Sequence, residues 1–206
     1  TLLLTLPAAT GLIVLAQPVM SVLFERGAFG PAEAEATANA LAAYASGLPA
    51  YVLIKALTPG FFAREDTRTP VKIAGACAVI NVGLNLILMW PFSYVGIAIS
   101  TAVAFWINAG ALAFVLWRRG HLGFDERLRQ RLPRSAAATA IMGGVCAFLH
   151  LQVLAPWLDG DQVQRVAALA ILIGAGLATF ALAAQVFGAA GIRDLRGFVK
   201  GPDAAA

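Results

Sequence analysis

The sequence predicts an all-α polytopic membrane protein, on the evidence of its composition and of the pattern of its apolar residues. Of 206 residues, 60% are hydrophobic and only 13% are charged, and the mean hydropathy is +0.78. Soluble domains have about 25% charged residues, and so few charges cannot cover a soluble domain of this size. The apolar residues form long runs without period-two alternation, which excludes transmembrane strands. Composition therefore excludes a soluble enzyme, a disordered chain and a disulfide scaffold.

Six apolar runs are long enough to cross a bilayer as helices, which takes about 20 residues each. They cover residues 2–24, 36–62, 72–91, 95–117, 135–157 and 166–188. The first run begins without the basic region and cleavage site of a signal peptide, so we expect the chain to be part of a longer protein. The second contains Pro49 and Pro59, and proline bends a helix by removing a backbone hydrogen bond.

The remaining runs follow one another through short connections. The third and fourth are separated only by residues 91–94, and the fifth and sixth by residues 156–164, which hold Asp159 and Asp161. The last two runs consist almost wholly of Ala, Leu, Val, Gly and Ile, which suits contact with lipid. The four tryptophans fall mostly near the predicted ends, as in an interfacial belt.

Basic residues are distributed unequally over these connections. Twelve of the 15 lysines and arginines lie in the second connection, the fourth connection and the C-terminal tail, whereas the alternate connections hold only Arg26 and Arg165. Because cytoplasmic loops carry an excess of Lys and Arg, this bias predicts a cytoplasmic C-terminus. The arginine-rich fourth connection can also contact anionic membrane lipids. We reject the alternative that it binds nucleic acid.

Lys55 lies well inside a predicted span, whereas the other lysines and the arginines lie in the connections, in the tail or at the edge of a span. A charge near the middle of a membrane helix costs about 2.5–3.5 kcal/mol. One interpretation is snorkelling, in which the side chain extends to the headgroups near Arg64, about 13 Å along the helix. The other is a cation that faces a water-filled cavity and can bind an anionic group.

The second connection holds a cluster of charges: Arg64, Glu65, Asp66, Arg68 and Lys72. Pro70 predicts a helix break near Thr69. One interpretation is a solvated loop with internal ion pairs. The other is a cytoplasmic gate or headgroup contact, made by Arg64, Asp66, Arg68 and Lys72, in which the arginines bind phosphate.

Asn81 and Asn85 are four residues apart on the third span and share a helix face. Such amides usually hydrogen-bond one helix to another, and the alternative is that they line a polar cavity. Cys77 and Cys146 lie inside apolar runs and have no disulfide or metal spacing. The sequence contains no catalytic set, metal set or phosphate-binding loop, so we expect neither an enzyme nor a cofactor.

Three segments resemble the MurJ/MviN family of lipid II flippases, within the MOP exporter superfamily. They are Leu23–Phe29 (LFERGAF), Tyr44–Pro49 (YASGLP) and the long run Lys55–Lys72. Members have fourteen helices, in two six-helix lobes and a C-terminal pair. They move lipid II, an undecaprenyl diphosphate that carries the peptidoglycan precursor, across the bacterial inner membrane by alternating access. Residues 120–206 match mainly in hydropathy and spacing.

The resemblance implies that this chain is the C-terminal part of such a transporter, without its eight N-terminal helices. The implied parts are four second-lobe helices (1–117), a basic cytoplasmic loop (118–134), a helix pair with a lipid-tail groove (135–188) and a cytoplasmic tail (189–206). Lys55, Asn81 and Asn85 are expected in the substrate cavity. The alternatives are an exporter of lipid-linked polysaccharide or drugs, and a membrane scaffold that transports nothing.

Overall fold

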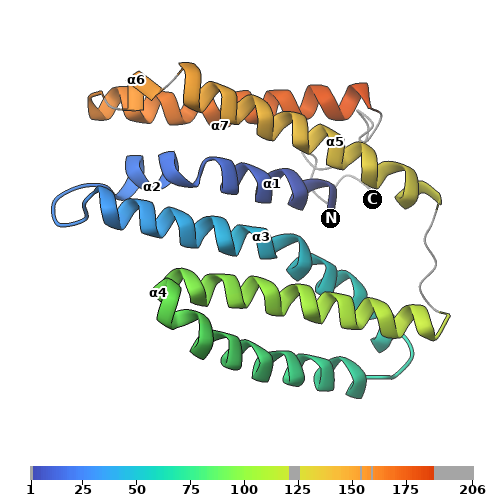
Figure 1. Ribbon diagram of the computed structural model, residues 1–206. Coiled ribbons are helices and arrows are strands. Elements are labelled where there is room, and N and C mark those ends of the chain that lie inside the picture. The colour runs from blue at the N-terminus through green and yellow to red at the C-terminus, as the bar shows by residue number, and fades with distance from the viewer. Residues whose placement is uncertain (1, 121–125, 154, 159, 188–206) are drawn as a thin grey trace, which may run out of the picture.

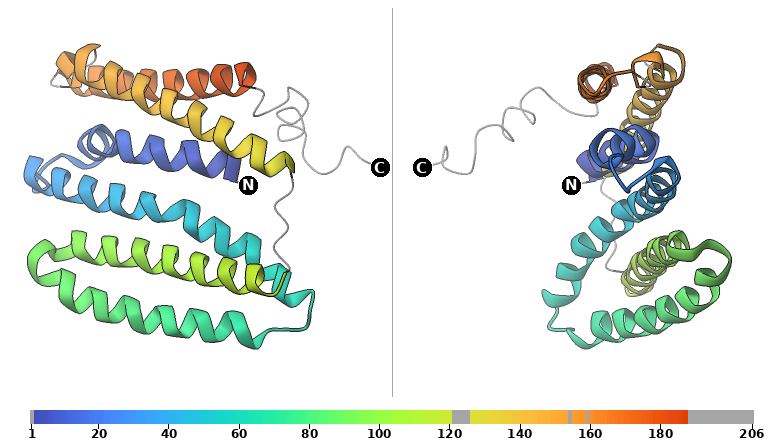
Figure 2. Two further views of the ribbon diagram at one scale, coloured as in Figure 1. Left: turned by 45° about the vertical axis from the view of Figure 1, so that its right-hand side comes forward. Right: turned by 90° about the vertical axis from the view of Figure 1, so that its left-hand side faces the viewer.

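The computed structural model describes residues 2–120, 126–153, 155–158 and 160–187, and every element named within them is helical. In chain order these are α1 (Leu2–Val14), α2 (Ala16–Phe24), α3 (Pro31–Phe62), α4 (Arg68–Arg118), α5 (Glu126–Phe148), the π-helical turn η1 (Leu149–Val153), α6 (Ala155–Leu158) and α7 (Gln162–Val186). The α1–α2 pair lies between α3 and the α5–α7 pair (Figures 1 and 2). The all-α prediction is confirmed for these residues.

The helices α1 and α2 form one apolar stretch that bends by 65° at Leu15. The sequence predicts a single span over residues 2–24, and Pro18 explains the bend. Because proline has no N–H, Pro18 cannot donate to the carbonyl of Val14, four residues earlier. On either side of this gap, the N–H groups of Leu15 and Val19 keep their helical bonds, at 2.9 Å each.

The helix α3 begins at Pro31, before the predicted start at residue 36. Proline is favoured at the first position of a helix, and the N–H of Gly30 donates to Oε2 of Glu33 at 3.0 Å. These capping features extend the helix beyond its apolar run. Pro49 and Pro59 lie inside α3 without interrupting it.

The helix α4 has 51 residues, far more than one crossing of a bilayer needs. The backbone leaves the helical conformation at Ser93 (φ 49°, ψ −131°), within the predicted connection 91–94. The chain reverses there, and two antiparallel arms lie side by side (Figure 1). Gly96 allows this close contact, because a Cβ there would overlap the carbonyl oxygen of Leu88 on the first arm.

The helix is interrupted between Phe62 and Arg68, so the predicted break is present but lies a few residues before Thr69, and the first arm already begins at Arg68. Pro70 falls in the first turn, where backbone N–H groups have no partner within the helix, so a proline is tolerated. The N–H of Thr69 donates instead to Oδ1 of Asp66, at 3.0 Å.

The helix α5 begins at Glu126, inside the stretch expected as a loop (118–134). Glu, Arg, Leu and Gln fill its first turns, and these residues favour helix. The predicted span over 135–157 is covered by α5 followed by η1 and α6. The helix α7 then returns along α5.

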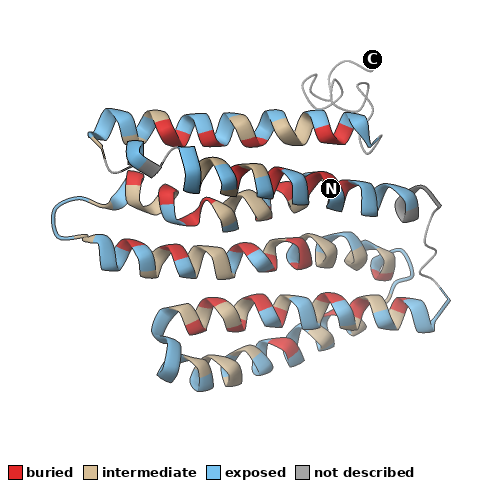
Figure 3. Ribbon diagram, turned by 45° about the horizontal axis from the view of Figure 1, so that its top comes forward, coloured by how far each residue is buried: buried red, intermediate tan, exposed pale blue. Residues whose placement is uncertain are grey.

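Apolar clusters among the described residues hold the helices together, two of them with several buried members, and buried residues lie in stripes along the facing sides (Figure 3). One cluster joins the α1–α2 bend to α5 and α7; it consists of Leu15, Met142, Cys146, Ala168 and Leu172. The other joins the end of α3 to the second arm of α4 through Phe61, Leu112 and Leu116. Between membrane helices, such contacts stabilise by van der Waals packing.

Four described helices are long and apolar enough to cross a membrane, or five if the bent α1–α2 pair is one span. The four are α3, α4, α5 continued into η1, and α7. Large apolar side chains are exposed on them, such as Val79 (74%) and Trp90 (85%) on the first arm of α4. The chain is therefore a polytopic helical membrane protein.

Replacing Gly96 with alanine is expected to destabilise the α4 hairpin, because the added methyl group forces the arms apart. Overpacking of this kind costs about 1–3 kcal/mol. We expect the Tm in detergent to fall by at least about 2 °C. Gly110→Ala on the same arm is the control, since no atom lies within 4 Å of a Cβ there. Equal Tm values for the two variants would contradict the tight contact.

Candidate functional site

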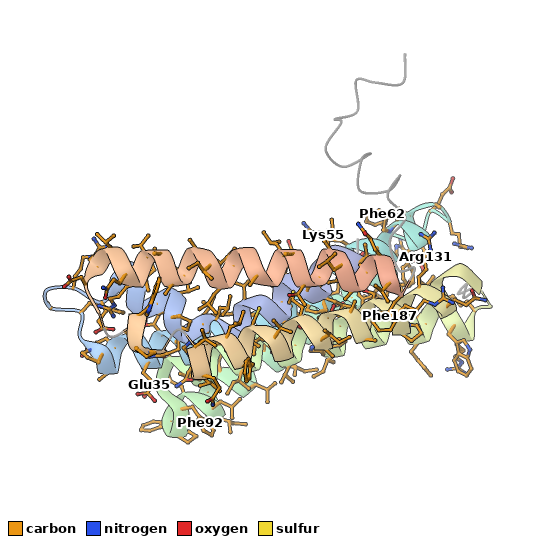
Figure 4. The ribbon with its side chains drawn as sticks, turned by 90° about the horizontal axis from the view of Figure 1, so that it is seen from above. Glu35, Lys55, Phe62, Phe92, Arg131 and Phe187 are labelled. Atoms are coloured by element: carbon orange, nitrogen blue, oxygen red, sulfur yellow. The ribbon has the colours of Figure 1, made fainter. Side chains whose placement is uncertain are left out.

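Lys55 is exposed on α3, and its ammonium group lies against an aromatic ring. Its Nζ is 4.7 Å from the centroid of the Tyr51 ring, one helical turn nearer the start of α3. A cation at this distance is attracted by the ring. Within the described ranges, no acidic side chain pairs with Lys55. Figure 4 shows Lys55 toward the end of the bundle that carries Phe62 and Arg131.

The Tyr51 ring is supported by the neighbouring helix. The ring of Phe105, on the second arm of α4, has its centroid 5.5 Å from that of Tyr51, with an angle of 43° between the planes. The arm can approach because α3 has a glycine at this level: a Cβ on Gly47 would lie 3.0 Å from the Cα of Ala102. Tyr51 was predictable from its i−4 spacing to Lys55, but Phe105 had no sequence signal.

Asn81 and Asn85 share one face of the first arm, as predicted. The amide of Asn85 donates to Oδ1 of Asn81 at 2.8 Å, and the hydroxyl of Ser100, buried on the second arm, donates to Oδ1 of Asn85. These bonds join the two arms and agree with the interhelical interpretation. The cavity-lining role of the two asparagines stays a prediction. Sequence reasoning missed Ser100, a small residue among alanines.

Asp66 is the centre of a polar cluster outside the membrane-spanning segments. Nη1 of Arg119, just beyond α4, lies 2.6 Å from Oδ2 of Asp66, and Oγ1 of Thr69 donates to the same oxygen at 2.7 Å. The Arg119 guanidinium, followed by Thr69, holds the pKa of the Asp66 carboxyl well below its ordinary value of 3.8. Asp66 therefore ties the two ends of α4 together, and it agrees with the interpretation of internal ion pairs.

The other predicted gate residues have different surroundings. Nη1 of Arg64 donates to the carbonyl of Gly60 at 2.6 Å, in the last turn of α3, where carbonyls lack helical partners and a cation is favourable. Arg68 and Lys72 are exposed and share a face of α4. Since α3 ends at Phe62, Arg64 is not on that face.

A second polar contact joins α2 to α7 at the opposite end of the bundle. Nη2 of Arg165 lies 3.1 Å from Oε2 of Glu25, and Nε2 of Gln162 donates to the carbonyl of Val22 at 3.3 Å. Both acceptors belong to the end of α2. The contact brings together the first and fifth connections, which the charge bias assigns to one side of the membrane.

Comparison with known protein families identifies the relatives of this chain. The family model for the lipid II flippase MurJ matches residues 1–168. The chain belongs to this family. The resemblance predicted from the three segments is thereby confirmed, and the match covers α1 through α6 and the first turns of α7.

Curated relatives in the MurJ family share long stretches with this chain. The probable lipid II flippase MurJ of Rhizobium meliloti (strain 1021) is 43% identical over 206 residues, covering 97% of this chain and 38% of the relative. The probable lipid II flippase MurJ of Vibrio cholerae is 38% identical over 177 residues, covering 86% of this chain and 34% of the relative. The chain thus spans little more than a third of the length of these MurJ relatives.

A solved structure of the lipid II flippase MurJ in an inward closed conformation has the same arrangement. It matches 95% of this chain and 38% of that chain, with a TM-score of 0.74 and 23% sequence identity. At this identity the similarity shows the fold alone. The helix arrangement described above is therefore a MurJ arrangement.

Asp66→Asn is expected to lower the Tm at neutral pH, because it removes the charged partner of Arg119. A carboxyl whose pKa is lowered on folding stabilises the fold above its ordinary pKa of 3.8, and the contribution is lost as the pH falls below that value. The Tm difference between wild type and variant should therefore shrink as the pH falls below about 4. Thermal unfolding over a pH series measures it, with Glu65→Gln as the control. A pH-independent difference would show that the ion pair does not stabilise the fold.

Proposed function

We propose that the chain is the C-terminal part of a flippase that moves lipid II across the bacterial inner membrane by alternating access. Membership of the MurJ family is the observation that carries this proposal. The chain spans 38% of the Rhizobium relative, so the activity belongs to the complete transporter, including the eight N-terminal helices. The protein is a transporter rather than an enzyme.

The direction of the Lys55 side chain supports a role in substrate binding. A snorkelling lysine would extend toward the near end of the bundle, where α3 finishes at Phe62. The ammonium group instead lies 4.7 Å from the ring centroid of Tyr51, a residue whose backbone position is about 6 Å further from that end along the helix axis. Diphosphate and sugars cannot enter hydrocarbon unaided, and an unpaired cation in a hydrated cavity can bind the diphosphate oxygens.

The helices suggest six membrane crossings. They are the α1–α2 pair, α3, each arm of α4, α5 with η1 and α6, and α7. With Asp66 and Arg119 on the cytoplasmic side, Glu25 and Arg165 lie on the outer side. Residues 1–117 then supply four helices of the second lobe, and the pair within residues 135–188 packs beside them with a groove for the lipid tail. The residues of the proposed cytoplasmic tail (189–206) lie outside the described part of the chain.

Exposed cations at the proposed cytoplasmic end suit a first contact with the headgroup. Arg68 and Lys72 are exposed on one face of α4. Arg64 and Asp66 are bonded to helix ends, so we assign them to holding this region in place. Asn81 and Asn85 present amides deeper along the same arm, and we retain them as candidate cavity residues.

Lys55→Ala in the full-length protein is expected to reduce lipid II flipping about tenfold, because a charge-assisted bond to the diphosphate is lost. Lys55→Arg should retain most of the activity, since the positive charge remains. Flipping is measured in proteoliposomes with fluorescent lipid II and an impermeant quencher. Arg118→Ala, which removes an exposed cation outside the proposed cavity, is the control. Unchanged flipping by Lys55→Ala at equal protein amounts would refute the role of Lys55.

The orientation is tested by labelling single cysteines in a cysteine-free background of the full-length protein. Arg134→Cys is expected to react with an impermeant thiol reagent only from the cytoplasmic side. Asp161→Cys, at the start of α7, should react only from outside, because the two positions flank the predicted span over residues 135–157. Labelling of position 134 from outside would invert the topology.

A further inference from the structure

The surroundings of Lys55 differ from those of Arg119 and Arg165. Arg119 and Arg165 are each paired with a carboxylate, which neutralises much of their charge. The ammonium of Lys55 lies over the face of Tyr51 instead. A ring holds a cation in place through its quadrupole but carries no net charge, so the positive charge of Lys55 is left uncompensated.

The Tyr51 ring is itself held in place by α4. The Phe105 ring packs against it, and one residue further along the arm the indole N–H of Trp106 donates to the backbone carbonyl of Ser46 at 3.0 Å. This hydrogen bond and the close approach at Gly47 fix the position of the second arm along the axis of α3. The ring under Lys55 is therefore fixed by two helices.

We propose that Tyr51 is the positioning residue for Lys55: its ring holds the ammonium away from the near end of α3 and available to a phosphate oxygen. The inference rests on the proposed function, in which Lys55 meets an anionic headgroup. Attraction to a ring is weaker than a charge-assisted hydrogen bond to phosphate. The ammonium can therefore leave the ring for the arriving anion and return to it afterwards.

Two substitutions of Tyr51 distinguish a role in positioning Lys55 from simple packing against Phe105. Tyr51→Phe keeps the aromatic face and its contact with Phe105, and it removes only the hydroxyl. Tyr51→Leu keeps an apolar side chain against Phe105 but removes the quadrupole that attracts the cation. If Tyr51 acts through Lys55, the leucine variant has an effect only where Lys55 is present.

The first experiment measures lipid II flipping by the full-length protein in proteoliposomes. Tyr51→Leu is expected to slow flipping about threefold, and Tyr51→Phe less than twofold. In a Lys55→Ala background, Tyr51→Leu is expected to cause no further loss. An equal loss from Tyr51→Leu in both backgrounds, or an equal loss from the phenylalanine and leucine variants, would overturn the positioning role.

The second experiment does not depend on transport. An impermeant amine-reactive ester is applied from the side on which α3 ends, and labelling of Lys55 is measured by mass spectrometry relative to Lys72 in the same molecule. Without the ring, the Lys55 side chain is free to snorkel toward this side. The ratio is therefore expected to rise at least about twofold in Tyr51→Leu and to stay unchanged in Tyr51→Phe. An unchanged ratio in Tyr51→Leu would overturn the inference.

Together the two experiments distinguish the failure of each proposal. If Lys55→Ala flips lipid II normally while the labelling ratio still rises in Tyr51→Leu, the substrate contact is refuted and the positioning by Tyr51 is supported. If flipping requires Lys55 but Tyr51→Leu changes neither flipping nor labelling, the positioning is refuted and the substrate contact is supported.

Discussion

The close approach of α3 to the second arm of α4 is the contact on which the candidate site depends. It is possible because Gly47 has no side chain at the point where Ala102 passes. A Cβ on Gly47 would lie only 3.0 Å from the Cα of Ala102. With the helices this close, Phe105 reaches Tyr51, and Tyr51 in turn lies beneath the ammonium of Lys55. Small residues have this effect in membrane helices generally, because packing replaces the hydrophobic effect as the source of stability.

Where α3 and the second arm of α4 end, apolar contacts hold them together first, and polar contacts follow beyond the helix ends. Phe61 is buried between Leu112 and Leu116, and the Arg119 guanidinium lies 5.9 Å from the Phe61 ring centroid. Arg119 then reaches Asp66, which also caps the start of α4. Apolar contacts thus hold the segment within the proposed membrane, and charged contacts hold the part where water is available to solvate them.

Much of this fold could be predicted from the sequence, because apolar runs of about 20 residues require helices in a bilayer. The apolar run around Lys55 likewise predicted its place inside a helix, and the four-residue spacing of Asn81 and Asn85 predicted their shared face. The helix ends could not be predicted in this way. Pro31, at the start of α3, and Pro70, in the first turn of α4, lie in polar segments, where hydropathy does not indicate where a helix begins. The contacts of Asp66 with Arg119 and of Tyr51 with Phe105 were missed because the partners are more than 50 residues apart along the chain, and only the folded arrangement brings them close.

The contact between α2 and α7 has a consequence for the order of assembly. The partners in each of its two bonds are 140 residues apart, so the ribosome completes α2 long before Gln162 and Arg165 exist. Until then the Val22 carbonyl and the Glu25 carboxylate at the end of α2 lack these partners and depend on water at the membrane surface. The end of α2 is therefore completed only when α7, the last described helix, has been inserted, and a nascent chain that stops before α7 leaves α2 without these two bonds.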